Sequence, residues 1–272
     1  MFFEYKIKRL SSILLATSLM LMVIFCEKPV ARQGYRIVSL SPAMTEIVFA
    51  LGGQNMLVGV TTYCDYPEAA KKITKVGDFS NPSLERIVGL NPDLVIVNLP
   101  EQMRIKQALE KLKINIFVSM PKSLDDIYRE IADIGRLINR DKNADSIVGL
   151  LQRTIIPVNN TRKRVYIEIS PRPLVTIGSS TFLNQLIEMA GGENIFSELD
   201  KDYPVVSQEE IIARDPEVII VLHRESIAGR LGWKKITAVK NNKVYLDLNP
   251  DYLMRPGPRI VLGYDELKEI LE

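Results

Sequence analysis

A stretch of fifteen residues occurs twice in this chain. Residues 83–97 (SLERIVGLNPDLVIV) align without gaps with residues 207–221 (SQEEIIARDPEVIIV), and six of the fifteen positions are identical. In each copy a serine can cap a short helix, a proline ends that helix, and a Val/Ile-rich run follows. A run that is apolar along its whole length is typical of a strand buried in a parallel sheet. The repeat therefore predicts two similar α/β lobes within one chain.

The remaining sequence extends this alternation on both sides of a helical middle. Strands are expected at 36–40, 57–60, 94–97, 114–118, 165–169, 218–222 and 243–246, and helices at 84–90, 103–112, 183–190, 209–213 and 259–271. In the middle, Leu124, Ile127, Ile131, Ile134 and Ile138 recur at the three-to-four spacing of a helix with one apolar face. A second helix is expected at 142–156, before Pro157.

The first residues have the character of an export signal. Three basic groups in residues 1–9 precede seventeen uncharged positions that end at Cys26. This is the pattern of a secretory signal peptide, and the run is short for a transmembrane helix. Cys26 suggests a lipoprotein cleavage site with a lipidated cysteine, although Phe25 is larger than the residue usual there. Ordinary cleavage nearby and an uncleaved anchor remain open, and each of the three places the body outside the cytoplasmic membrane.

The expected organisation has four parts. They are a leader at 1–26, an N-terminal α/β lobe at 27–121, a helical segment at 122–158 and a C-terminal α/β lobe at 159–272.

Composition excludes several kinds of site. The chain has 35 Lys and Arg against 33 Asp and Glu, and without the leader the two signs balance at 32 each. A neutral body lacks the basic footprint expected of a nucleic-acid-binding protein. One histidine and two cysteines are too few for a zinc site of several His or Cys ligands, so no metal site is expected. The sequence has no GxSxG elbow, P-loop or Rossmann glycine motif, and we expect no enzyme.

Within the repeat, Glu85 aligns with Glu209. A glutamate in the first turn suits the positive end of the helix dipole, which is a purely structural role. Alternatively, two glutamates at equivalent places on two lobes would offer a partner a symmetric pair of acidic contacts. Glu210 lies three residues after Ser207, where it completes a capping box, so Glu209 is the better candidate for docking.

Several motifs resemble the periplasmic binding proteins of ABC importers for corrinoids, siderophores and haem. They are residues 36–52 (RIVSLSPAMTEIVFALG), 62–67 (TYCDYP), 76–97, 164–174 (RVYIEISPRPL), 191–196 (GGENIF) and 255–260 (RPGPRI). Together they resemble the cobalamin-binding branch more closely than the siderophore or haem branches. The resemblance covers residues 36–272 and implies two α/β lobes with mainly parallel sheets, bridged by a single long helix, with a ligand cleft between them. It makes residues 142–156 the expected bridge.

The resemblance also implies site residues. Tyr63, Phe79 and Tyr203 match aromatic positions of the family's cleft, and Asp251 and Arg255 match a polar pair that contacts the corrinoid, with Tyr252 beside them. All three aromatic residues lie in loops at predicted strand ends, although an isolated Tyr or Phe is more often packed in a core. For Asp251 and Arg255 the alternative is a solvated surface pair.

The implied ligand is cobalamin, carried without a cofactor. Related haem binders place an iron-ligating tyrosine near position 79, where this chain has phenylalanine, but Tyr63 leaves haem open. Anionic ferric siderophores favour several basic cleft groups, and only Arg255 and Arg172 are candidates.

The implied partners are the permease dimer of an ABC importer with its ATPase subunits, reached through Glu85 and Glu209. Neither nucleic acid nor a membrane is expected as a partner, apart from a lipid anchor at Cys26, and the body is expected to be a periplasmic or extracytoplasmic monomer.

Overall fold

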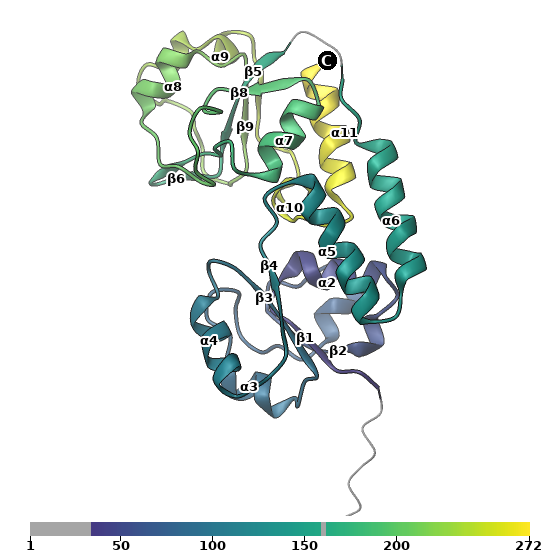
Figure 1. Cartoon of the computed structure of the whole chain (residues 1–272). Helices are drawn as coiled ribbons and strands as arrows, with labels where there is room; N and C mark the ends of the chain where they lie inside the picture. The colour runs from purple at the N-terminus through teal and green to yellow at the C-terminus, as the bar shows by residue number, and fades with distance from the viewer. Residues whose placement is uncertain (1–33, 159–161) are drawn as a thin grey trace, which may run out of the picture. The chain divides into compact units, whose positions relative to one another are not determined.

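Two four-stranded parallel sheets organise the computed structural model, which describes residues 34–158 and 162–272 (Figure 1). The first sheet has the order β2-β1-β3-β4 and consists of β1 (Ile37–Ser39), β2 (Leu57–Val60), β3 (Leu94–Asn98) and β4 (Ile116–Ser119). The second has the order β10-β9-β5-β8 and consists of β5 (Lys163–Glu168), β8 (Gly192–Asn194), β9 (Val218–Val221) and β10 (Val244–Tyr245). A short antiparallel hairpin, β6 (Ser170–Pro171) with β7 (Leu174–Val175), follows β5.

The two sheets have the same topology. In each, the first strand in sequence lies between the second and the third, and the fourth forms the edge beside the third. The repeated segments occupy equivalent places, because residues 83–97 form α3 (Leu84–Gly89) and β3, and residues 207–221 form α8 (Gln208–Arg214) and β9. Ser83 and Ser207 both cap their helices, as predicted. The prediction of two α/β lobes with mainly parallel sheets is confirmed.

The other helices cover these sheets. In the N-terminal lobe they are α2 (Pro42–Ala50), α4 (Met103–Lys111) and the 3-10 turns η1 (Gln54–Met56) and η2 (Glu68–Lys72). In the C-terminal lobe they are α7 (Phe182–Met189), α9 (Thr237–Lys240), α10 (Pro250–Met254), α11 (Ile260–Leu271) and the 3-10 turn η3 (Trp233–Lys235). None of the helices in the described ranges is long and apolar enough to cross a membrane.

Two helices form the segment between the two sheets, and the second corresponds to the bridging helix expected at 142–156. They are α5 (Leu124–Leu137) and α6 (Asp141–Thr154), of fourteen residues each. α5 begins beside α7, where Leu124 N donates to Gln185 Oε1 at 2.8 Å, and it packs against α2. α6 begins beside α2, where Asn143 Nδ2 donates to Leu51 O at 2.9 Å, and ends beside α11, whose Tyr264 hydroxyl donates to Ile156 O (Figure 1). The break at 139–141 turns the chain because Asn139 adopts a positive φ of 56°.

One continuous cluster of buried side chains runs through this bridge. It includes Ile47 of α2, Ile131 of α5, Leu151 of α6, Leu186 of α7 and Leu267 of α11. The outer faces of the two sheets are closed by two smaller clusters, one for each lobe. Moving one sheet against the other would disturb a shared core, so the fold resists large lobe motions.

The predicted elements match most of the observed ones, but the short elements β6, β7, β8, α9 and α10 were not predicted. β8 was not expected as a strand, because glycine, glutamate and asparagine are poor strand formers. It forms because Gly192 lies against α7, β5 and α11, where an added Cβ would come within 2.6 Å of Ile187 and about 3.1 Å of Leu271. The leader at 1–26, including Cys26, lies outside the described residues, and the predicted lobe boundaries stay predictions.

Candidate functional site

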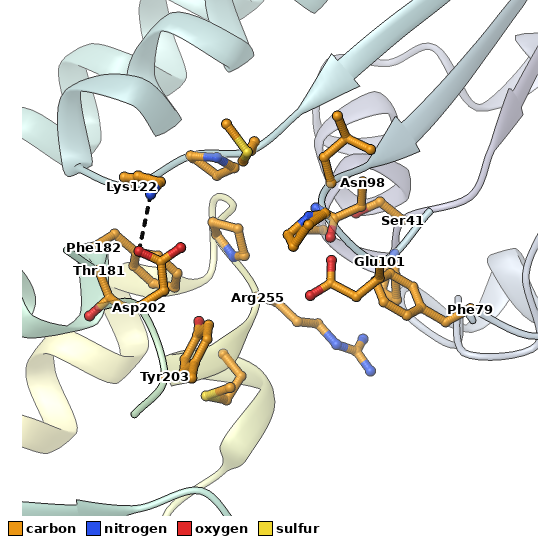
Figure 2. Close-up of a pocket in the computed structure, with 18 of the residues that line it drawn as sticks. Ser41, Phe79, Asn98, Glu101, Lys122, Thr181, Phe182, Asp202, Tyr203 and Arg255 are labelled. Carbon is orange, nitrogen blue, oxygen red and sulfur yellow. Dashed lines mark hydrogen bonds and ion pairs between the residues drawn. The ribbon is translucent and has the colours of Figure 1, made fainter. Parts of the chain in front are cut away.

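A cleft lies at the carboxyl ends of the N-terminal sheet. The loops that follow β1, β2, β3 and β4 all contribute to its wall, as expected for a binding site in a parallel α/β structure. Its volume is about 440 Å³ (Figure 2). The lining residues are Ser41, Pro42, Ala43, Tyr63, Phe79, Ser80, Asn98, Leu99, Pro100, Glu101, Met120, Pro121, Lys122, Ser180, Thr181, Phe182, Asp202, Tyr203, Met254, Arg255 and Pro256.

The loops of the N-terminal wall are joined by one buried amide. Gln102 is 2% exposed, and its Nε2 donates to Leu40 O at 3.0 Å and to Phe79 O at 2.8 Å. Its Oε1 accepts from Asn98 N at 2.8 Å. One side chain therefore holds the loops after β1 and β3 and the loop that carries Phe79. Sequence reasoning missed Gln102, because an isolated glutamine carries no pattern that distinguishes it.

Aromatic side chains stand on both walls of the cleft. Tyr63 and Phe79 come from the N-terminal lobe, and Tyr203 comes from the C-terminal lobe. Tyr63 is 59% exposed and Tyr203 is 45% exposed, so neither is packed in a core. The structure brings all three together, while their role in binding stays a prediction. Phe182, the first residue of α7, adds a fourth ring that the sequence reading did not single out.

The predicted polar pair is arranged differently from the expectation. Arg255 lines the cleft, but Asp251 and Tyr252 do not. Asp251 Oδ1 lies 3.0 Å from Arg255 Nη2, and Tyr252 packs against Arg259, whose guanidinium lies 5.2 Å from the ring centre. The two residues lie on the short helix α10, whose last residue Met254 lines the cleft, and they contact the arginines. Their expected direct contact with a ligand stays a prediction.

The Arg255 guanidinium joins the two lobes. Its Nη1 lies 3.0 Å from Glu46 Oε1 and 2.8 Å from Asp65 Oδ1, both in the N-terminal lobe. The side chain is 14% exposed, so this is not a solvated surface pair. Burial works against ionisation of Asp65, but the hydrogen bond and charge of Arg255 outweigh burial and lower the pKa of that carboxyl.

A second arginine extends this network. Arg259 donates to both oxygens of Glu46, from Nε at 2.7 Å and from Nη2 at 2.6 Å, and its guanidinium stacks on Tyr66 at 3.9 Å. We call Glu46, Asp65, Asp251, Arg255 and Arg259 the interlobe ion network. Sequence reasoning missed Glu46 and Arg259, since they lie more than two hundred positions apart.

The cleft has no unpaired cation among its lining residues. Lys122 Nζ lies 3.1 Å from Asp202 Oδ1, and Figure 2 shows this contact between the two walls. Arg255 is engaged by three carboxylates. Burial raises the pKa of Tyr203 to about 12, with the charges of Asp202 and Glu101 adding to the effect.

The two predicted docking glutamates occupy matching positions. Glu85 and Glu209 are each the second residue of their helices, α3 and α8, and both are exposed. Across residues 34–158 and 162–272, neither carboxylate forms a hydrogen bond or ion pair. Glu210, in contrast, completes the predicted capping box, accepting from Ser207 N at 2.8 Å.

Other chemically notable side chains serve the fold. Cys64 is 1% exposed, and its Sγ lies 3.2 Å from the hydroxyls of Thr45 and Thr61. His223 Nε2 lies 2.7 Å from the buried carboxylate of Glu168, outside the cleft. In the described parts of the chain, no group of three or more His, Cys, Asp or Glu side chains is placed to hold a metal ion.

Comparison with known proteins agrees with this architecture. Residues 37–250 match the periplasmic binding protein family. The chain is 33% identical over 248 residues to a vitamin B12-binding protein of Vibrio parahaemolyticus, covering 87% of this chain and 89% of the relative. It is 32% identical over 256 residues to the ABC transporter substrate-binding lipoprotein YvrC of Bacillus subtilis, covering 88% and 81%.

A solved structure is similar over nearly its whole length. It is described as a possible iron-binding, periplasmic solute-binding protein of Staphylococcus epidermidis, with a TM-score of 0.76 and 31% identity over 87% of this chain and 98% of that chain. The names of all three proteins describe binding or transport, and none describes catalysis. By its sequence match and its two-lobed fold, the chain belongs to the periplasmic binding protein family of ABC importers.

Proposed function

We propose that this protein captures a corrinoid, cobalamin, in the cleft between its lobes and delivers it to an ABC importer. The main support is the chemistry of the cleft. Aromatic rings stand on both walls, and each cation of the lining is paired with a carboxylate. A flat, bulky macrocycle with neutral amides at its rim suits such a surface. The B12-binding relative, at 33% identity, supports the same ligand.

The size of the ligand sets a condition on this proposal. A cobalamin is larger than the drug-sized ligands that fill pockets of this volume. Its binding requires the Lys122–Asp202 contact across the cleft to open. The two side chains are 50% and 38% exposed, and an exposed ion pair of this kind contributes about 0–1 kcal/mol. The contact therefore opposes entry only weakly.

A ferric siderophore or haem is the alternative ligand. The iron-binding description of the Staphylococcus epidermidis structure favours it. The paired cations of the cleft argue against an anionic siderophore.

The test is a calorimetric titration of residues 27–272 with cyanocobalamin, haemin and a ferric siderophore. One-to-one binding of the corrinoid alone is the expected result. Binding of haemin or the siderophore instead would keep the transport role and reassign its ligand. Failure of all three ligands to bind would contradict the proposal.

The cleft residues are tested by a double variant, Tyr63→Ala with Tyr203→Ala. We expect affinity for cyanocobalamin to fall at least tenfold, because each ring supplies contact area that alanine lacks. Tyr35→Ala is the matched control, since Tyr35 is also partly exposed but does not line the cleft. Equal affinities for the double variant and the parent would refute the cleft assignment.

We further propose that Glu85 and Glu209 bind the permease dimer of the importer, which in turn binds its ATPase subunits. Exposed charges at an interface mainly steer and orient the complex. Glu85→Lys with Glu209→Lys should reduce uptake by at least tenfold and leave ligand affinity unchanged. Glu193→Lys with Glu269→Lys is the control, because these exposed glutamates lie outside α3 and α8. Unimpaired uptake by the docking variant would contradict this role.

The leader and the lipoprotein relative support an exported protein tethered through Cys26. We propose that the body works outside the cytoplasmic membrane as a monomer, with its two lobes at 27–121 and 159–272 and the helical segment at 122–158 between them.

A further inference from the structure

One carboxylate in the cleft has no counter-ion. Glu101 lines the wall between β3 and α4, and the described part of the chain gives it no hydrogen bond or ion pair. Figure 2 shows its carboxylate facing the space between the walls, opposite Asp202 and Tyr203. The charge of Glu101 is felt at Tyr203, whose pKa rises chiefly through burial and further through Asp202 and Glu101. The two residues therefore share one space.

Glu101 is also held in place. It directly precedes Gln102, whose backbone N–H donates to Asn98 O at 3.1 Å and whose side chain is fully hydrogen-bonded in the wall. These bonds fix the backbone beside Glu101, while its own side chain is exposed and forms no hydrogen bond in the described part of the chain. It acts on whatever occupies the cleft.

The surrounding charges do not neutralise Glu101. Together, the charged lining residues and the interlobe ion network comprise five carboxylates (Glu46, Asp65, Glu101, Asp202 and Asp251) and three cations (Lys122, Arg255 and Arg259). Two negative charges are left over at the cleft. Glu101 is exposed to solvent, and a ligand bound in the cleft displaces part of that water, so this excess then repels an anion and attracts a cation or a hydrogen-bond donor.

We propose that Glu101 is a charge-selecting residue of the cleft, which favours neutral or cationic corrinoids and rejects those that carry a free carboxylate. The inference rests on the corrinoid-binding function proposed above. The amide groups at the rim of an intact corrinoid offer N–H donors to Glu101. When a carboxylic acid replaces one of these amides, its carboxylate faces the carboxylate of Glu101. No unpaired cation among the lining residues offsets the repulsion between the two.

Three probes that share one ring system test this inference. At pH 6, aquocobalamin carries one positive charge, cyanocobalamin is neutral, and a cobalamin monocarboxylic acid carries one negative charge. Each is titrated into residues 27–272 of the parent and of Glu101→Gln at low and at high ionic strength. The absorption spectrum of bound aquocobalamin checks that cobalt keeps its water.

In the parent we expect affinity to fall about three- to tenfold with each step from positive to negative probe at low salt, and less at high salt. Glu101→Gln should reduce the ratio between the highest and the lowest of the three affinities, so that the logarithm of this ratio is less than half of the parent's value. Glu193→Gln, at an exposed position that does not line the cleft, should leave the range unchanged. That pattern supports charge selection by Glu101.

Two results would overturn it, and they are distinguishable. If the corrinoids bind but Glu101→Gln changes all three affinities equally, or none, the selecting role fails while the proposed function stands. If no corrinoid binds the parent, the proposed function fails and this inference fails with it.

Discussion

At the residue scale, the cleft depends on side chains that no ligand needs to touch. Gln102 satisfies one backbone donor and two backbone acceptors from three different loops. A buried amide with all of these partners is stabilising, whereas the loss of the amide leaves each partner buried and unsatisfied. The position of Phe79 is therefore set by Gln102 as much as by its own packing.

Gln102→Leu tests this support. We expect a loss of about 2–3 kcal/mol in the free energy of unfolding, because the buried backbone groups lose their partners. Urea denaturation measures the loss, and ligand titration should show weaker binding through the released Phe79 loop. Gln107→Leu on the exposed face of α4 is the control, with an expected effect within about 0.5 kcal/mol. A stability equal to that of the parent would show that Gln102 does not brace the wall.

At the element scale, α5 is joined to the loop that enters the cleft. Glu130 of α5 accepts from Ser119 Oγ at 2.8 Å and from Met120 N at 3.0 Å, immediately before Pro121 and Lys122. Burial raises the pKa of Glu130 to about 7, and the nearby charges of Asp126 and Asp133 add to this, against the two hydrogen bonds. The folded state therefore binds a proton that the unfolded chain releases near the ordinary pKa of 4.5.

The sign of the resulting pH dependence follows from linkage. Between pH 4.5 and 7 the folded state holds more protons at Glu130 than the unfolded state does, so this residue's contribution to stability falls as pH rises. We expect a change of about 3 kcal/mol across that window, which Glu130→Gln should remove. Thermal denaturation of both proteins at several pH values measures it, with Asp125→Asn on the exposed side of α5 as the control. An identical pH profile for Glu130→Gln would contradict the assignment.

At the scale of the whole molecule, the lobes are joined by both a shared core and the interlobe ion network. Glu46 is 4% exposed and accepts from two arginines of the C-terminal segment. Arg259 immediately precedes α11, which packs against α7, so the network connects α2 to the C-terminal lobe. Together with the α5–α6 bridge, these contacts favour small lobe movements over a wide hinge.

Glu46→Gln should therefore weaken the whole fold. Removing one partner of a buried ion network leaves the arginines undercompensated and costs about 3–5 kcal/mol. For a protein of this size we expect Tm to fall by roughly 6–15 °C, measured by calorimetry. Glu68→Gln removes the carboxylate of an exposed pair with Lys71 and should change Tm by less than about 3 °C. If the two variants have equal Tm values, the network is not a structural link.

Much of the architecture follows from local sequence patterns. The repeat at 83–97 and 207–221, with its capping serines and buried strands, determined two equivalent α/β units, and the apolar spacing from Leu124 to Ile138 determined α5. These features need only neighbouring residues, because capping and amphipathic periodicity are local. Tyr63, Phe79 and Tyr203 were assigned to the cleft by the family resemblance, and their positions in loops beside predicted strands and helices agreed with it.

Tertiary structure alone decided the rest. β8 is a strand because Gly192 fits between α7 and α11, and Asp251 forms an ion pair with Arg255 because α10 places the two side chains together. The ion pairs of Glu46 with Arg255 and Arg259, and the unpaired charge of Glu101, depend on which groups meet across long separations in the chain. A local sequence pattern does not predict such long-range contacts. Charge pairing and burial depend on the residues that surround a segment in the folded protein and not on the segment itself.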